Sequence, residues 1–274
     1  VHFLDVGQGD CTVIELPDGK KIMIDGGDGS AENNRKIADS LDDLGIGRLD
    51  EVILTHSDRD HSGGIESVLD EVEVSGIYLP YKPTLGSDEV YFSLCRKAEA
   101  EVPAVKYAPE RYDYIRGDTY DYFLTFLWPR RFDAAPEGDA NYYSAVLWLE
   151  YEGLSILFAG DMTKETEDEL MREYALASDI FDWDDMHVSL ESTEVLKVAH
   201  HGSATSSGEA WLRLLSPEAA VISVGADNGY GHPSDEVVAA LHAAMPEGEV
   251  YRTDECGDIL LTSAGGGAYT FSYQ

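Results

Sequence analysis

The sequence has few basic residues for its length. Its 274 residues include 19 Lys and Arg against 53 Asp and Glu, which gives a formal net charge of −34. Such a surface repels nucleic acid at long range, whereas tight DNA-binding proteins usually carry a basic patch. The composition therefore argues against a tight polynucleotide binder, although it leaves open a slow nuclease or an enzyme with a small phosphodiester substrate. Adaptation to high salt or a need for solubility also explains the charge.

The sequence also lacks a long apolar run and a regular cysteine pattern. No run approaches the roughly 20 apolar residues that cross a bilayer, so we expect no membrane span in this chain. The three cysteines, Cys11, Cys95 and Cys256, have no spacing typical of a metal knuckle or a disulfide framework. They are predicted to be minor core residues, and they indicate no compartment.

The chain begins at Val1, inside a strand-like run, rather than at a methionine. We therefore expect that an upstream signal peptide, membrane part or tag has been removed, which favours an extracytoplasmic location over a cytoplasmic one. The 43% hydrophobic content suffices for one large core or for two half-cores in a sandwich. Nothing in the composition predicts an oligomeric state.

The most informative stretch is residues 55–64, THSDRDHSGG, which directly follow the apolar run 52–54. A hydrophobic strand that ends in polar residues and glycines is where an α/β protein places its chemistry. Imidazole and carboxylate groups bind Zn(II), Mn(II) or Fe, and here two histidines and two aspartates lie within six residues. Because four ligands within six residues cannot all bind one ion comfortably, the stretch predicts two adjacent metals. The alternative is an acidic surface turn with exposed histidines.

Other polar groups follow predicted strands later in the chain. Asp161 ends the apolar run 155–159 after Gly160, and the segment 200–203, HHGS, follows the run 195–199. His232 lies between a glycine and a proline at a predicted strand-to-helix turn. That position predicts a proton donor to a leaving group or a phosphate contact rather than a packed residue.

Apolar periodicity predicts an α/β chain in which short strands alternate with helices. The predicted strands are 1–6, 11–16, 20–25, 52–54, 76–79, 120–128, one ending at 148, 155–159, 195–199 and 220–224. The runs 249–252, 257–263 and 268–273 are predicted to finish a second sheet. The predicted helices are 33–44, 65–72, 88–101, 165–177 and one that starts at Ser234. The loop 129–140 is the expected boundary between two αβ halves, roughly 1–135 and 136–274, of a single domain, and the acidic segment 179–185 is predicted to be a solvated loop.

These motifs resemble those of the metallo-β-lactamase superfamily. Residues 56–61 read His-x-Asp-x-Asp-His, with Asp58 where most members carry a second histidine. Together with residues 4–10, LDVGQGD, and 200–203, HHGS, this variant resembles the soluble domain of ComEC-type DNA-uptake proteins and their free-standing relatives. Phosphorylcholine esterases are similar at the same His-x-Asp-x-Asp-His element. The resemblance implies a four-layered αβ/βα sandwich, with two mixed sheets face to face, helices outside, and a metal cleft at one edge.

The resemblance also implies roles for individual residues. One metal would be held by His56, Asp58 and Asp161, and the other by Asp60, His61, Asp161 and His201. Asp60, His200 and His232 would serve catalysis, with His200 facing the substrate, although the roles of His200 and His201 can be exchanged. The supporting or substrate-facing residues would be Asp5, Gln8, Asp10, Asp25, Asn141, Ser144 and Ser203. Of these, Gln8 and Asp10 are expected at the rim of the cleft. Asp25 is expected to steady the metal-site loop from behind. The Asn141–Ser144 element is expected where most members carry a third histidine ligand.

The implied function is metal-dependent hydrolysis with two divalent ions, Zn or Mn. The oxygen-rich first site favours harder ions such as Mn(II). A phosphodiesterase or nuclease is favoured, with single-stranded DNA or a small diester as the substrate. The alternatives are a hydrolase of a carbonyl substrate (a thioester, lactone or β-lactam) and a non-catalytic module that binds metal or a partner protein.

Overall fold

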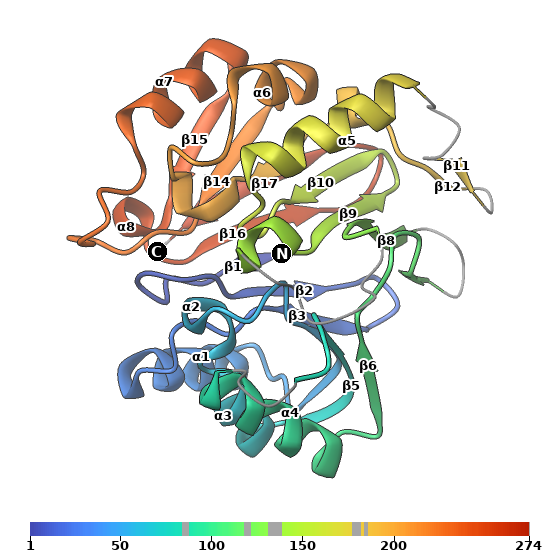
Figure 1. The fold of residues 1–274 in the computed structure, drawn as a ribbon, viewed down its shortest axis with the longest axis vertical. Helices are drawn as coiled ribbons and strands as arrows, with labels where there is room; N and C mark the ends of the chain where they lie inside the picture. Colours follow the sequence, from blue (N-terminus) through green and yellow to red (C-terminus); the bar gives the residue numbers. More distant parts are fainter. Residues whose placement is uncertain (84–87, 118–121, 131–138, 177–181, 184–185, 274) are drawn as a thin grey trace.

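Two mixed β-sheets pack face to face, and helices cover the outer face of each sheet (Figure 1). The computed structural model describes residues 1–274 except 84–87, 118–121, 131–138, 177–181, 184–185 and 274. Helices α1, α3 and α4 lie outside one sheet, and α5, α6 and α7 lie outside the other. The arrangement confirms the predicted four-layered αβ/βα sandwich.

The first sheet has eight strands in the order β17-β16-β1-β2-β3-β4-β5-β6. Its strands from β3 to β6 are parallel, and those from β17 to β3 are antiparallel. The bounds are β1 His2–Phe3, β2 Thr12–Glu15, β3 Lys21–Ile24, β4 Arg48–Ile53, β5 Glu73–Leu79, β6 Ala104–Tyr107, β16 Ile259–Ser263 and β17 Tyr269–Tyr273.

The second sheet has seven strands in the order β15-β14-β13-β10-β9-β8-β7. The bounds are β7 Tyr114–Arg116, β8 Tyr122–Trp128, β9 Val146–Tyr151, β10 Leu154–Phe158, β13 Val195–Lys197, β14 Ala219–Ile222 and β15 Glu249–Arg252. Strands β10, β13, β14 and β15 are parallel, so their carboxyl ends share one edge of the sheet. A separate two-stranded ribbon pairs β11 Asp182–Trp183 with β12 Met186–His187.

Some of the helices begin at side chains that cap their free backbone N–H groups. Ser30, Asp88 and Ser234 accept such hydrogen bonds at the starts of α1, α4 and α7. The bounds are α1 Ala31–Asp43, α2 Arg59–Ser62, α3 Ile65–Glu71, α4 Glu89–Glu101, α5 Lys164–Leu176, α6 Glu209–Leu215, α7 Asp235–Ala244 and α8 Thr253–Cys256. In the described part of the chain, 3-10 turns cover Ala140–Tyr143, Leu190–Ser192 and Ala199–Gly202. Within the described ranges, no helix combines the length and apolar character needed to cross a bilayer.

Three apolar cores fill the spaces between the four layers. The inner core, between the sheets, includes Phe3, Phe126 and Phe158. One outer core packs the first sheet against α1, α3 and α4, and the other packs the second sheet against α5, α6 and α7. Because both faces of the central strands are buried, polar side chains are left to the strand ends, where the candidate site forms.

The strands differ from the prediction in several respects. Strands β6, β7, β11 and β12 were not predicted, and β1 covers only two residues of the predicted run 1–6. The prediction that 257–263 and 268–273 finish the second sheet is wrong: β16 pairs with β1 and therefore closes the first sheet. Only the run 249–252, as β15, lies in the second sheet.

The sheets do not divide at residue 135. Strands β7 and β8 precede the loop 129–140 but belong to the second sheet, so the chain crosses between sheets after β6. Residues 131–138 of that loop, and 179–181 and 184–185 of the acidic segment, lie outside the described residues. The single-domain organisation itself stays a prediction.

Candidate metal centre

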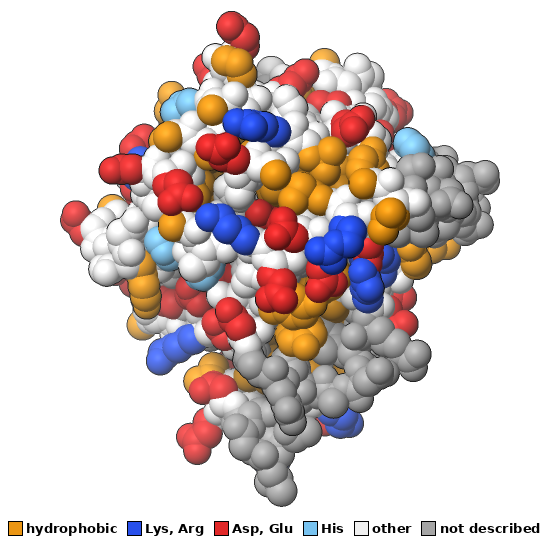
Figure 2. All heavy atoms as spheres, turned by 45° about the horizontal axis from the view of Figure 1, so that its top comes forward, with side chains coloured by type: hydrophobic (Ala, Val, Ile, Leu, Met, Phe, Trp, Pro, Cys, Tyr) orange, Lys and Arg blue, Asp and Glu red, His pale blue; other side chains and the backbone are white. Residues whose placement is uncertain are grey.

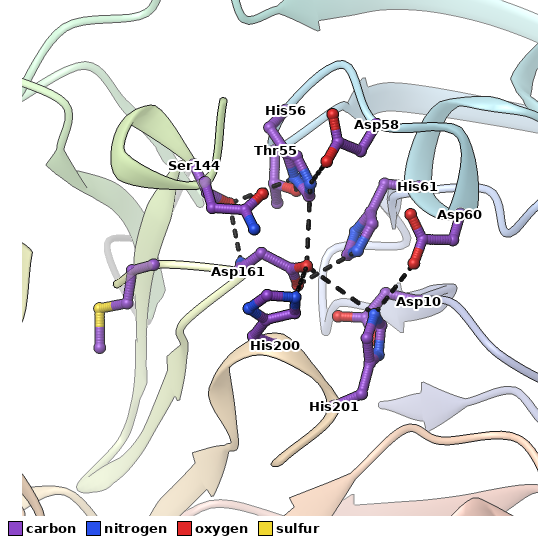
Figure 3. A network of polar contacts seen from close by, with 12 residues as sticks. Asp10, Thr55, His56, Asp58, Asp60, His61, Ser144, Asp161, His200 and His201 are labelled. Atoms are coloured by element: carbon purple, nitrogen blue, oxygen red, sulfur yellow. Dashed lines mark hydrogen bonds and ion pairs between the residues drawn. The ribbon is translucent and has the colours of Figure 1, made fainter. Parts of the chain in front are cut away.

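The predicted metal-binding side chains converge at one edge of the sandwich, where strand ends from both sheets meet (Figure 3). The first sheet contributes the segment after β4 and the short helix α2, and the second sheet contributes the segments after β10 and β13. The residues brought together in this way are His56, Asp58, Asp60, His61, Asp161, His200 and His201.

Asp161 lies at the centre of this cluster, and both of its carboxylate oxygens face imidazole nitrogens. Its Oδ1 lies 3.1 Å from His61 Nε2. Its Oδ2 lies 3.8 Å from His56 Nε2, 3.6 Å from His200 Nε2 and 3.8 Å from His201 Nε2. Burial alone would raise the pKa of Asp161, but the facing His61 and His201 hold it well below its ordinary value. A carboxylate in this position can link two cations.

Several potential ligand atoms are buried without a hydrogen-bond partner in the described part of the chain. They are His56 Nε2, His61 Nε2, Asp161 Oδ1 and His201 Nε2. Unpaired buried polar atoms are costly and rare in folded proteins, so a group that is missing here is expected to satisfy them. Among the described residues there are three groups whose ligand atoms all lie within 4.8 Å of one another: His56, His61 and Asp161; Asp60, His61 and His201; and Asp10, Asp25 and His61. The donor set therefore fits divalent metal ions.

Asp25 fixes the orientation of His61. The buried Asp25 carboxylate accepts hydrogen bonds from the Thr55 backbone N–H at 2.8 Å, from Thr55 Oγ1 at 2.8 Å, and from His61 Nδ1 at 2.8 Å. Because His61 Nδ1 is held in this way, His61 Nε2 faces the cluster. The contacts match the predicted support of the metal-site loop by Asp25.

His201 is held from behind by a buried network. Its Nδ1 donates to the Ser223 carbonyl at 2.9 Å and lies 3.3 Å from Asp10 Oδ1, while its Nε2 lies 3.3 Å from Asp60 Oδ2. Burial would lower the pKa of His201, but the carboxylates of Asp161, Asp10 and Asp60 outweigh it and raise the pKa to about 10. The network thus points His201 Nε2 toward the carboxylates of Asp60 and Asp161, whose negative charge attracts cations.

A buried ammonium group completes this network, and sequence reasoning missed it. Lys197 Nζ lies 2.6 Å from Asp10 Oδ2, and the side chains of both residues are at least 90% buried. Lys197 is a lone charge in the apolar run 195–199, which is the signal that would have revealed it. The expectation that Asp10 lies at the rim of the cleft is wrong, because the Lys197 pair holds Asp10 behind His201.

Residues 4–10 pack against α2 at the Asp60 backbone. A Cβ on Gly9 would lie 2.3 Å from the Asp60 carbonyl oxygen, so only glycine allows this approach, and the Asp10 N–H donates to the same oxygen at 3.2 Å. Gln8 Oε1 accepts from the Gly225 N–H at 3.3 Å. Asp5 does not join the cluster: its described contacts are with Gly7, Asp258 and Lys36, so its placement among the site residues is not supported by the structure.

The turn that carries His200 and His201 has an unusual backbone. Both residues are left-handed, with φ of 51° and 52°, and Gly202 continues at 79°. Non-glycine residues are strained there and need surrounding structure to hold them. The two rings diverge: the His201 side chain is 1% exposed, and the His200 side chain is 22% exposed, with Nδ1 3.2 Å from Thr205 Oγ1. Both Nε2 atoms still lie near Asp161, so the assignment of His201 as the ligand stays a prediction.

Ser144 and Asn141 lie beside Asp161 in the second half of the chain. Ser144 Oγ accepts the Asp161 N–H at 2.9 Å and lies 3.4 Å from His56 Nδ1, so it positions both residues. Asn141 is buried in the turn Ala140–Tyr143, and its Oδ1 has no partner among the described residues. Ser203 instead contacts Thr205 and stabilises the loop after the histidine turn.

The remaining predicted residues line the open side of the site. The Asp58 side chain is 51% exposed and lies 3.8 Å from His56 Nε2. The His232 ring lies 5.6 Å from the His200 ring, measured between centroids. Burial and the neighbouring His200 and His201 lower the pKa of His232. Tyr230, which the sequence reasoning did not consider, stacks on His232 at 5.8 Å between ring centroids.

Comparisons with known proteins agree with this geometry. A family model described as the Metallo-beta-lactamase superfamily matches residues 4–226. ComE operon protein 3 of Bacillus subtilis is 31% identical over 278 residues, which cover 94% of this chain and 32% of that protein. Competence protein ComA of Neisseria gonorrhoeae is 30% identical over 267 residues, which cover 97% of this chain and 33% of that protein. The chain spans about a third of the length of these curated relatives.

A solved structure shows the same fold. The metallo-beta-lactamase fold protein YhfI from Bacillus subtilis aligns with a TM-score of 0.52 and 10% sequence identity. The alignment covers 92% of this chain and 95% of that one. At this identity the likeness concerns the fold alone, and the relatives' names agree with the predicted ComEC-like branch.

Proposed function

The chain belongs to the metallo-beta-lactamase superfamily, and from this premise we propose that it is a metal-dependent phosphodiester hydrolase. The observation that carries the proposal is the set of buried, unpartnered ligand atoms around Asp161. These atoms come from both sheets and converge on Asp161. The partly exposed His200 lies beside Asp161, with His232 next to it, so we expect a substrate to approach the cluster from this side.

We assign the residues, as the resemblance implies, to two ligand sets that share Asp161. His56, Asp58 and Asp161 would hold one ion, and Asp60, His61, Asp161 and His201 the other. When bound, the ions supply positive charge that activates a water nucleophile near neutral pH and neutralises charge on the attacked phosphate. Because two of the three donors in the first set are carboxylates, that site favours harder ions such as Mn(II) over Zn(II).

The chain's own residues orient the reaction. Asp25 and Asp10 hold the His61 and His201 rings through Nδ1, and Ser144 holds the Asp161 backbone. His232, on the open side, is the proposed proton donor to the leaving group or the contact to a phosphate oxygen. Burial and the neighbouring His200 and His201 lower the pKa of His232, whereas a bound anion would favour its charged form.

A phosphodiester substrate is favoured over a carbonyl compound by two considerations. The relatives include a protein named for competence, which points toward DNA, and the oxygen-rich donor set suits a charged displacement. The proposed substrate is a single strand of DNA or a small diester. The net charge of −34 argues against capture of long polyanions by general electrostatic attraction.

The proposal is tested by metal analysis and by a comparison of substrates. Purified protein should contain divalent metal, and with Mn(II) it should hydrolyse a chromogenic phosphodiester and single-stranded DNA, but not nitrocefin. Asp161→Ala should abolish hydrolysis, whereas the control Asp39→Ala, at a 66% exposed side chain on α1, should not. Hydrolysis of nitrocefin alone would favour a carbonyl hydrolase. Metal-loaded protein that is inert toward every substrate would favour a non-catalytic module.

A further inference from the structure

Tyr230 is an exposed aromatic residue at the mouth of the metal centre. Its side chain lies in the loop between β14 and α7, with Gly229 and Gly231 on either side, and the residue is 74% exposed. The ring stacks on His232 with a centroid distance of 5.8 Å and an interplanar angle of 25°. The His232 ring in turn lies 5.6 Å from the His200 ring. The His232 ring therefore lies between Tyr230 and His200, and His200 contacts Asp161.

The loop that presents Tyr230 is fixed by one side chain. Asn228 Nδ2 donates to the carbonyl oxygens of Gly225 at 3.0 Å and His232 at 2.6 Å. Asn228 Oδ1 accepts from the backbone N–H groups of Tyr230 at 3.2 Å and His232 at 3.0 Å. These four bonds hold the backbone on both sides of Tyr230, so the segment that carries the ring is not a free loop.

The surface offers little positive charge with which to hold a polyanion. Figure 2 shows Asp and Glu side chains spread over one face of the molecule, with few Lys and Arg. Most described Lys and Arg side chains form ion pairs with acids, and Lys164 on α5 pairs with Glu236 of α7. Contacts that do not depend on surface charge would therefore add to the affinity that bound metal ions give a nucleotide substrate. Stacking of a base on an aromatic ring is such a contact.

We propose that Tyr230 is a stacking platform for a nucleobase next to the phosphodiester that is cleaved. The proposal rests on the proposed phosphodiesterase function and narrows its substrate to diesters that carry a nucleobase. One face of the Tyr230 ring rests on His232, and the other is open to a base. A base stacked there would lie on the outer face of Tyr230, with His232 on the inner face.

Exposed tyrosines by themselves are common and carry no such meaning. Tyr273, which is 60% exposed, is an example: it is the last residue of β17 and contacts Tyr251, and no described contact joins it to the cluster. Tyr230 differs because it adjoins the site residue His232 and because its backbone is fixed. Tyr273 therefore serves as the matched control.

The test compares substrates with and without a base in Mn(II)-loaded protein. Kinetics are measured for a short oligothymidylate, for the dinucleotide thymidylyl-thymidine, and for an oligonucleotide of the same length whose residues are abasic. Tyr230→Ala should raise KM for the oligothymidylate by about five- to a hundredfold, the range expected for one stacked base. Its effect on KM for the abasic strand should be much smaller. Tyr230→Phe and Tyr230→Trp should retain the low KM, and Tyr273→Ala should leave it at the wild-type value.

The outcomes separate the platform from other roles. If the dinucleotide shows the same rise in KM as the oligonucleotide, one base of a small diester suffices; if only the longer strand responds, the platform serves a polynucleotide. An equal loss of kcat on all three substrates would mean that Tyr230 only positions His232, and would overturn the platform. Equal KM values of wild-type protein for thymidylate and abasic strands would also overturn it, while leaving the phosphodiesterase function intact. Wild-type protein that hydrolyses no diester would refute the proposed function and the platform together.

Discussion

The two sides of the metal centre differ in how firmly the fold holds them. On the inner side, His61, His201 and Asp161 are almost fully buried, and each is anchored by a further buried group. On the open side, Asp58 and His200 are 51% and 22% exposed at their side chains. Asp58 contacts His56, and His200 contacts Asp161 and Thr205. Among the described contacts, neither side chain is held by a buried hydrogen-bond partner like those of His61 and His201.

This difference suggests a division of labour. Buried hydrogen bonds fix tautomers and ring directions, which metal binding requires. Exposed groups around a fixed cluster can change partners when a substrate arrives. We therefore expect substitutions on the inner side to change metal content or stability, and substitutions on the open side to change turnover or metal preference with the fold intact.

The largest effect is expected from Asp161→Ala. Its two oxygens face His61 and His201 at the same time, so its removal should release both ions from an otherwise folded protein. Elemental analysis of the purified variant measures the metal, and circular dichroism checks the fold. Two equivalents of metal still bound to the variant would show that Asp161 is not a bridge.

Lys197→Met should destabilise the inner side strongly. It leaves the buried Asp10 carboxylate without its ion-pair partner, which typically costs about 3–5 kcal/mol. Adding Asp10→Asn should recover part of that loss, because the buried charge is then gone. Chemical denaturation of metal-free protein measures both variants. A double variant no more stable than Lys197→Met would mean that the pair is not coupled.

The same pair predicts a pH dependence. Burial opposes ionisation of Asp10, but the Lys197 ammonium outweighs burial and holds the pKa of Asp10 far below its ordinary value. Because the pKa of Asp10 is lower in the folded than in the unfolded protein, its ionised form stabilises the fold. This contribution is complete above the unfolded-state pKa of about 3.9 and is lost as the pH falls toward the folded-state pKa. The pair should therefore contribute constant stability near neutral pH and lose it only in strong acid. The double variant should lose less stability than wild type over that acid range.

His232→Ala tests the open side. The variant should keep its metal and lose turnover by a factor of about a hundred, as expected for a lost proton donor. The loss should be smaller for a substrate with a nitrophenolate leaving group, which needs little protonation. His201→Ala should instead lose metal and fail on both substrates. Loss of metal from the His232 variant as well would identify His232 as a ligand.

The smallest effect is expected from Asp58→His, because the change exchanges one ligand for another at an exposed position. Activity should be greater with Mn(II) than with Zn(II) in the wild type, and the variant should shift the preference severalfold toward Zn(II) because imidazole is a softer donor. Rates with each metal at saturating concentration measure the preference. An unchanged ratio would show that Asp58 does not bind metal.

The strands and the polar motifs that follow them could be predicted from the sequence, because they depend on residues that are neighbours in the chain. Alternation of apolar runs and polar ends predicted that each motif follows a strand, and these strands are β4, β10 and β13. That the segments 56–61, Asp161 and 200–201 meet at one edge was implied by the resemblance of the motifs to those of the superfamily. The cluster of unpaired ligand atoms lies where that argument placed it.

Other features depended on contacts between distant parts of the chain. Lys197 and Asp10 are 187 residues apart, so only packing of the two sheets revealed that their charges meet, and that Asp10 lies behind the site instead of at its rim. The pairing of β16 with β1, which places the end of the chain in the first sheet, is of the same kind. The sequence by itself determined which side chains could bind a metal, because ligand type and strand ends are local properties. The tertiary structure alone decided which of them are buried, paired or exposed, because burial depends on what packs against each residue from elsewhere in the chain.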